Sequence, residues 1–198
     1  MNKNVLSILV LVFFGLMISC NKDDSSDQTV TPTPPNVLCD GNGSSSYFPL
    51  ALGNMWEYSG QLIITMSVAK TITANGKSYY QVNCDDQLSD WKQYFRVDSN
   101  GDIYELINDE EYLFLPANPT IGQSWEYPCG FDGMGMRRVD NYPFALETKY
   151  CNYKNFIFVR DIDGTGDYLT SCTYVQGIGM TTYTAFYSTL DLSLILLN

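Results

Sequence analysis

The chain of 198 residues contains no histidine. Histidine is the side chain that most often serves as a general base or metal ligand near neutral pH, and Ser–His–Asp and Cys–His sites depend on it. Positive charge is also scarce, because 11 lysines and arginines face 22 acidic residues and leave a formal net charge of −11. A chain this acidic is expected to bind neither nucleic acid nor an anionic lipid surface. The composition therefore argues against a triad hydrolase and a nucleic-acid-binding protein.

The sequence also lacks an apolar run long enough for a membrane-spanning helix, which needs about 20 residues. Residues 5–18 are apolar except for Ser7 and Gly15, and Lys3 is the only charged side chain before them. A short charged start, a brief apolar run and small residues at its end are typical of a secretory signal peptide. We therefore expect residues 1–19 to be removed on export.

Residues 20–46 are rich in Asp, Ser, Thr, Pro, Asn and Gly and contain few apolar side chains. Residues 31–35 (TPTPP) favour an extended polyproline conformation, and residues 41–46 (GNGSSS) are typical of a flexible linker. Such a segment buries too little apolar surface to offset the entropy lost on ordering. We expect a disordered tether over residues 20–46, followed by one domain over residues 47–198.

The domain sequence shows short alternating runs separated by turn signals and no long stretch of helical periodicity. Residues 72–80 predict a hairpin with Asn75-Gly76 at its tip, the dipeptide preferred in type I′ turns. Residues 91–107 and 156–175 predict two further hairpins, and residues 190–196 alternate leucine with other side chains. The fold predicted is all-β, an antiparallel curved sheet that forms a partly closed barrel or sandwich.

One sequence pattern occurs twice, as residues 52–58 (LGNMWEY) and residues 121–127 (IGQSWEY). Alternate side chains share one face of a strand, so each copy places a tryptophan and a tyrosine together. These aromatic residues are Trp56, Tyr58, Trp125 and Tyr127. One interpretation is a pair of platforms that bind a sugar or an apolar ligand. The other, which we favour, is a strand start used twice with both tryptophans filling the core.

Acidic side chains gather in predicted turns. Asp161, Asp163 and Asp167 lie in one such turn, where carboxylate oxygens are possible ligands for Ca²⁺. The spacing does not fit an EF-hand, and aspartates also form hydrogen bonds within tight turns. A calcium site at these three residues stays an alternative to plain turn chemistry. No other cofactor is expected.

The cysteines suggest an oxidising compartment. Their spacing fits no zinc pattern, and no histidine is present to complete one. Two disulfides with one thiol left over are expected, and Cys39, in the tether, is the natural unpaired residue. Cys129 and Cys151 bracket a predicted hairpin near residues 141–143, so we expect a disulfide between them. A catalytic thiol would need a base other than histidine.

Residues 16–20 (LMISC) resemble the lipobox of bacterial lipoproteins. The resemblance implies that Cys20 carries a diacylglycerol through a thioether, with acyl chains such as palmitate as the membrane anchor. Residues 22–24 (KDD) resemble the acidic export signal of Bacteroidota-type lipoproteins, which implies the outer membrane or cell surface. The alternative is that these acids only solvate the linker.

Residues 47–58 (YFPLALGNMWEY) resemble the opening of a broad group of uncharacterised Bacteroidota-type secreted lipoproteins. That group has a Pro-Leu-x-x-Gly-x-x-Trp-x-Tyr motif after a tether, a second Gly-x-x-Trp near mid-chain and a late Gly-Ile/Val-Gly. Residues 122–125 and 177–179 match the second and third features. The usual Gly before an aromatic-x-Asn step is absent, because Cys151-Asn152 precede Tyr153 here. The resemblance implies a secreted β domain with no established catalytic activity.

Together these patterns predict a membrane-anchored, surface-exposed lipoprotein with a non-catalytic binding or assembly domain. Its partner is unknown, and a glycan, a lipid or a protein strand would each suit an aromatic-lined sheet. The alternative is a secreted hydrolase that uses a carboxylate pair, with or without calcium. Only the acidic turns support that alternative.

Overall fold

The structure is a computed structural model of the chain, and it describes residues 39, 43–129, 133–141, 146–148, 151–185 and 188–197. Residues 1–19, Cys20 and most of the tether lie outside the described residues. Within the described part the fold is all-β, as the sequence predicts, and it contains no helix. No helix in these ranges is long and apolar enough to cross a membrane.

The described residues form fourteen strands, most of them at the positions where the sequence alternates. In chain order they are β1 (Met55–Ser59), β2 (Ile63–Ala74), β3 (Lys77–Asp85), β4 (Asp90–Val97), β5 (Ile103–Ile107), β6 (Glu110–Leu115), β7 (Ser124–Pro128), β8 (Met134–Asp140), β9 (Leu146–Glu147), β10 (Asn152–Tyr153), β11 (Phe156–Ile162), β12 (Tyr168–Val175), β13 (Gly179–Ala185) and β14 (Ser188–Leu196).

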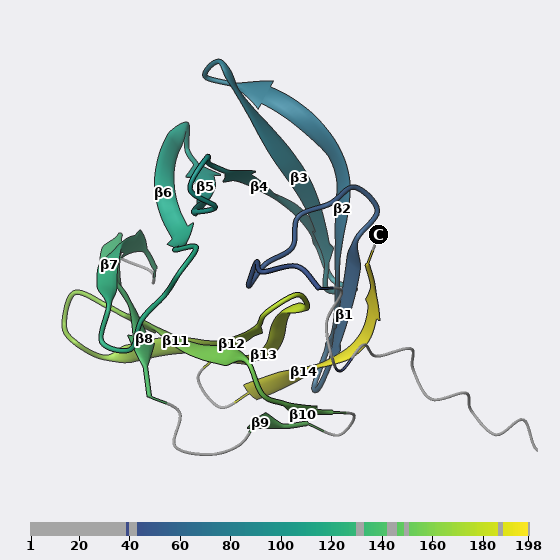
Figure 1. Cartoon of the computed structure of the whole chain (residues 1–198), viewed down its shortest axis with the longest axis vertical. Coiled ribbons are helices and arrows are strands. Elements are labelled where there is room, and N and C mark those ends of the chain that lie inside the picture. Colours follow the sequence, from purple (N-terminus) through teal and green to yellow (C-terminus); the bar gives the residue numbers. More distant parts are fainter. Residues whose placement is uncertain are drawn as a thin grey trace, which may run out of the picture. The chain divides into compact units, whose positions relative to one another are not determined.

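Twelve of these strands form one antiparallel sheet in the order β6-β5-β4-β3-β2-β1-β14-β13-β12-β11-β8-β7. Strands β9 and β10 pair separately as a small hairpin. The sheet curls until its two edge strands, β6 and β7, approach each other (Figure 1). The indole of Trp125 on β7 donates a hydrogen bond to the carbonyl of Leu113 on β6. The result is a nearly closed barrel, and the core lies inside it.

The barrel consists of two meanders, each six strands long. The first runs from β1 to β6, and the second contains β7, β8 and β11 to β14. The repeated sequence pattern begins both, and its glycines adopt the same conformation, with φ of 84° at Gly53 and 86° at Gly122. Gly53 N–H donates to the carbonyl of Val68 at 2.9 Å, and Gly122 N–H donates to that of Val139 at 2.8 Å. The sequence repeat is therefore also a structural repeat.

Residues 43–50, here called the N-terminal segment, enter the space enclosed by the sheet (Figure 1). Phe48 in this segment is 1% exposed and stacks on Trp56 with 5.3 Å between ring centroids. Ser46 O accepts a hydrogen bond of 2.8 Å from Gly177 N–H, in the turn between β12 and β13. The segment thus plugs one end of the barrel. Its contacts with the domain begin before residue 47, where we expected the tether to end.

Trp56 connects the early tryptophan motif to the late Gly-Ile-Gly motif. Its side chain is fully buried, and its indole N–H donates to the carbonyl of Ile178 at 2.6 Å. Gly179 has φ of +110°, and a Cβ built there would lie 2.9 Å from the indole nitrogen of Trp56. Glycine is therefore required at this position, both for backbone conformation and for space.

We expect Gly179→Ala to lower the free energy of unfolding by about 1–3 kcal/mol from backbone strain, with a further loss from displacement of Trp56. Gly76→Ala is the matched control, because Gly76 has φ of +72° and no atom within 4 Å of a built Cβ. Urea unfolding of the two variants separates the steric contribution from the strain. Equal losses in both would show that contact with Trp56 contributes nothing.

Candidate functional site

A cavity of about 470 Å³ occupies the end of the barrel opposite the plug. Its walls come from side chains on β1, β2, β4, β6, β7, β8, β11, β12, β13 and β14. Phe48 of the N-terminal segment contributes to the lining. Trp91, which is 39% exposed, and the half-buried Leu169 place its mouth where β4 and β12 begin.

One wall of the cavity is apolar apart from two tyrosines. It is formed by side chains on the four strands where the two meanders join. These residues are Tyr58, Ile64, Met66, Met180, Tyr183 and Leu190. A wall of this composition offers dispersion contacts and an apolar environment to a ligand.

The opposite wall contains a buried ion pair. Arg137 and Asp161 face each other across β8 and β11 and are 6% and 7% exposed. The guanidinium donates to both carboxylate oxygens, at 2.6 and 2.9 Å, and lies 3.7 Å from the centroid of the Tyr127 ring. Thr170 also donates to Asp161, at 2.8 Å. Because burial of either charge alone is costly, the two side chains stabilise the fold only as a pair.

Glu105 lies behind this wall and is 5% exposed. The hydroxyl of Tyr127 donates to it, and the amide of Gln93 donates to it at 3.2 Å. Burial raises the pKa of Glu105, while the hydrogen bond from Tyr127 and the charge of Arg137 oppose that rise. Among the described residues no lysine or arginine forms an ion pair with Glu105. Its carboxyl is therefore held by neutral donors.

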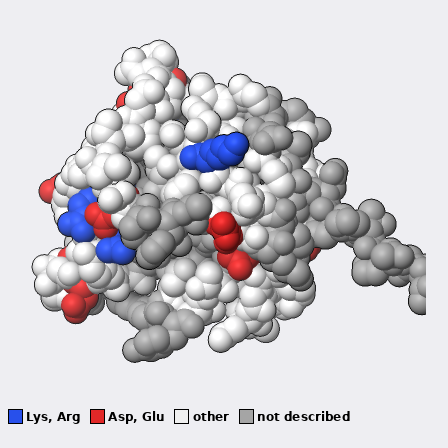
Figure 2. Space-filling view, turned by 60° about the horizontal axis from the view of Figure 1, so that its bottom comes forward, with Lys and Arg blue, Asp and Glu red and all other residues white. Residues whose placement is uncertain are grey.

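The two arginine side chains nearest to this ion pair in the sequence point out of the barrel. Arg138 and Arg160 both contact the carboxylate of Asp140 on the outer face of β8 and β11, at 2.6 and 3.3 Å. Figure 2 shows a face of the molecule where uncharged side chains dominate and the bases at the left lie against acids. Arg137 is thus the only lysine or arginine among the described residues that line the cavity.

The polar wall also closes the barrel. Strands β6 and β7 share no ladder of backbone hydrogen bonds among the described residues. Side chains bridge this seam instead, because Trp125 of β7 donates to the carbonyl of Leu113 at 2.8 Å and Arg137 of β8 donates to that of Phe114 at 3.1 Å. Arg137 therefore joins three strands, β6, β8 and β11.

Of the four aromatic residues considered as ligand platforms, two line the cavity and two do not. Trp56 is fully buried, Trp125 is half-buried, and neither lines the cavity. Both indole N–H groups are occupied by backbone carbonyls. Tyr58 and Tyr127 do line the cavity. The two tryptophans thus fill structural positions, and the aromatic ring at the mouth is Trp91.

The three aspartates considered for calcium do not converge. Asp161 points into the barrel toward Arg137, because it lies two residues from the inward-facing Val159 on β11 and shares its face. Asp163 accepts hydrogen bonds of 2.9 Å from the backbone N–H groups of Thr165 and Asp167 in an exposed turn. Within the described ranges no group of three His, Cys, Asp or Glu side chains is arranged to hold a metal.

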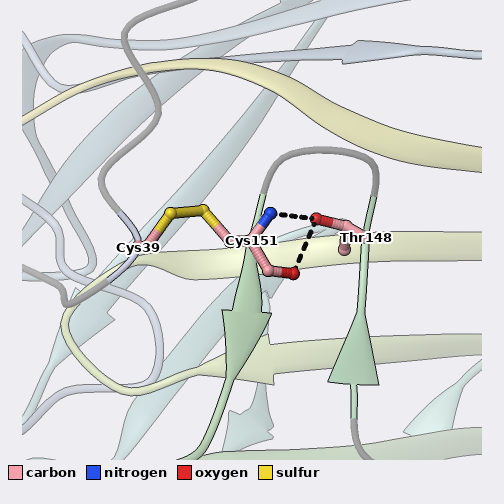
Figure 3. The surroundings of a disulfide bond; sticks show 3 residues. All are labelled: Cys39, Thr148 and Cys151. Atoms are coloured by element: carbon pink, nitrogen blue, oxygen red, sulfur yellow. Dashed lines mark hydrogen bonds between the residues drawn. A yellow bond between two sulfur atoms is a disulfide. The ribbon is translucent and has the colours of Figure 1, made fainter.

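The predicted disulfide between Cys129 and Cys151 is wrong. Cys151 instead bonds to Cys39, so the expectation that Cys39 stays unpaired is wrong as well (Figure 3). Cys129 is free and lies at the end of β7, where its sulfur is 3.5 Å from the carbonyl of Ile162. Cys151 belongs to the separate β9–β10 hairpin, where Thr148 accepts its backbone N–H at 3.1 Å. Part of the expected hairpin, residues 142–145, lies outside the described residues.

The remaining thiols behave as apolar side chains. Burial raises the pKa of Cys84 and of Cys172 to about 12, and it raises the pKa of Cys129 as well. A thiol acts as a nucleophile only as the thiolate, which these values disfavour at neutral pH. Cys129 and Cys172 line the cavity and add to its apolar surface.

The candidate site consists of the cavity and its buried ion pair, at the end of the barrel opposite the plug. A comparison with protein-family models found no match, and neither the curated proteins nor the solved structures gave one. The chemistry of the site is therefore derived from its residues. They form an apolar chamber with one polar wall and a mouth beside Trp91.

Proposed function

We propose that this chain is a lipid-anchored surface protein whose barrel binds a small, largely apolar molecule without transforming it. The observation that carries the proposal is the cavity of about 470 Å³ inside the barrel. Apolar walls with a few fixed polar groups are typical of small-molecule sites, and this volume lies in their usual range. A molecule within the chamber would contact Trp91, Met66 and Leu190, among other residues.

The proposed location of the protein in the cell rests on the sequence. The lipobox-like residues 16–20 support lipid attachment at Cys20, and the acids at residues 22–24 support the outer membrane or cell surface. The N-terminal segment enters the barrel at the plugged end, opposite the mouth. A disulfide joins Cys39 to Cys151, next to β10.

A hydrolase remains the alternative, and the two buried acids are the residues it would need. Both oxygens of Asp161 accept hydrogen bonds from Arg137, and Thr170 adds a third donor. Glu105 is not among the residues that line the cavity. A general acid or base must reach the reacting group directly or through one water. No observation therefore favours the hydrolase over a binding protein.

Quenching of Trp91 by a brominated alkane tests the proposal. Of the three tryptophans only Trp91 lines the cavity, so saturable quenching that disappears in Trp91→Phe reports occupancy there. The full chain is used, anchored in phosphatidylcholine vesicles. Leu169→Arg places a charge at the mouth and should weaken binding at least tenfold. Ile121→Arg is the control, because Ile121 is 71% exposed and does not line the cavity.

Two results would contradict the proposal. One is the absence of saturable quenching in the unaltered chain. The other is equal affinity in Leu169→Arg and Ile121→Arg, which would place the probe outside the barrel. Cys20→Ala should move the chain out of the membrane fraction, and retention there would contradict lipid anchoring through Cys20.

A further inference from the structure

The polar wall of the cavity indicates which chemical class of ligand fits, and this inference rests on the proposed binding function. From the pairing of its only cation and the neutral groups beside it, we infer that the ligand is an uncharged amphiphile. It has an apolar body and a hydroxyl or amide group, and it is not a carboxylate or a phosphate. Four properties of the cavity support this: its cation, its acids, its neutral groups and its rim.

The only cation in the lining is already paired. Arg137 uses two N–H groups on Asp161 and a third on the carbonyl of Phe114. A guanidinium in a bidentate pair with a carboxylate is neutralised in charge and fixed in orientation. An anionic ligand would have to displace Asp161 from Arg137, and that carboxylate would then be buried without a partner.

The acids near the cavity add to this discrimination against anions. Asp161 lies in the wall, and Glu105 lies directly behind Tyr127. At this end of the barrel β3 ends with Asp85, Asp86 lies in the following turn and β4 begins with Asp90, and the exposed Lys92 lies beside them. Like charges held close together in a poorly hydrated site repel strongly. A carboxylate inside the cavity therefore lies near the charge of Asp161, while Arg137 is already paired with that acid.

Neutral hydrogen-bonding groups are available at the same wall. Thr170 donates its hydroxyl proton to Asp161, which leaves its oxygen able to accept a hydrogen bond. Gln93 lines the cavity and uses one amide N–H on Glu105, so a second N–H remains on the same nitrogen. An acceptor and a donor on one wall suit a hydroxyl or an amide. Among the described residues of the lining, a cationic ligand finds only the carboxylate that is paired with Arg137.

The rim of the mouth suits the apolar part of such a ligand. Five large apolar side chains at this end of the barrel are between 39% and 81% exposed. They come from the turns and strand starts there, and they are Leu62, Ile63, Leu88, Trp91 and Met134, of which Trp91 lines the cavity. Apolar side chains gathered around a cavity mouth indicate a binding surface. An acyl chain longer than the cavity would continue across this rim.

Displacement of the brominated alkane measures the ligand class directly. A long-chain primary alcohol and the carboxylate of the same length are added in turn to the full chain in phosphatidylcholine vesicles, and recovery of Trp91 fluorescence is followed. We expect the alcohol to displace the alkane at a concentration at least tenfold lower than the carboxylate does. Equal potency of the two, or greater potency of the carboxylate, would overturn the inference while leaving the binding function intact.

Two acid-to-amide variants show whether charge inside the barrel causes the preference. Glu105→Gln keeps the shape of the side chain but removes its charge. It should bring the concentrations at which the alcohol and the carboxylate displace the alkane closer together. Glu126→Gln is the matched control, because Glu126 is exposed on β7 and outside the cavity lining. The same ratio in both variants would show that the buried acid does not determine the preference. Absence of alkane binding would instead refute the proposed function itself.

Discussion

Replacing Asp161 with Asn is expected to lower the free energy of unfolding by about 3–5 kcal/mol, because Arg137 then stays buried without a charged partner. The environment offers little compensation. Arg137 is 6% exposed and lies over the Tyr127 ring, so water has poor access to its charge. The amide of the variant can accept only one of the two hydrogen bonds that the carboxylate accepts. Urea unfolding followed by tryptophan fluorescence measures the loss.

Two further variants separate the ion pair from other effects at this position. Asp163→Asn makes the same chemical change in the exposed turn, where an amide oxygen can still accept from Thr165, and should change the stability by less than about 1 kcal/mol. The double variant Arg137→Met with Asp161→Leu should recover most of the loss, since apolar side chains of similar size often replace a buried pair without penalty. Some loss should persist, because Phe114 O then lacks its donor at the barrel seam. Equal stability of Asp161→Asn and Asp163→Asn would contradict the whole account.

The local features of the fold were predictable because they depend on short-range chemistry. Asn75 and Gly76 have positive φ and form the tip of the β2–β3 hairpin, as the Asn-Gly signal predicts. Alternation along residues 190–196 predicted a strand with the leucines on one buried face. Strand β14 buries Leu190 and Leu192 as predicted, but a register shift against β1 then turns Ile195 inward and leaves Leu196 45% exposed. The joining of the two meanders into one sheet was not predictable to the same degree. It depends on pairing between β1 and β14, which stand at opposite ends of the domain sequence.

The candidate site was harder to predict, since it depends on which face of a strand points inward. Arg137 and Arg138 are neighbours of the same type, and only the pairing of β8 with β11 and β7 decides that Arg137 faces the cavity. Asp161 was interpreted as part of a turn, whereas β11 continues to Ile162. Residues 91–107 were predicted as a hairpin, but nothing in the sequence indicated that Trp91 at its start borders a cavity.

The pairing of Cys39 with Cys151 leads to the second large effect. We expect Cys39→Ser to lower the free energy of unfolding by about 2–5 kcal/mol, the usual loss when a native disulfide is removed from a secreted domain. The bond spans a sequence separation of 112 residues, and a loop of this length restricts the unfolded chain strongly. It also holds the start of the N-terminal segment near the barrel, where Phe48 fills the core. Urea unfolding without reductant measures the change.

The disulfide accounts for the loss only if three further measurements agree. Cys151→Ser should lose about as much as Cys39→Ser, although Cys151 is itself buried and its hydroxyl replacement adds a small cost. The double variant should lose no more than the larger of the two single losses, because either substitution alone already removes the bond. With reductant present, the unaltered chain should unfold at nearly the urea concentration of Cys39→Ser. If reductant leaves the unaltered chain as stable as before, while Cys39→Ser is destabilised, the loss belongs to the side chain of Cys39 and not to its bond with Cys151.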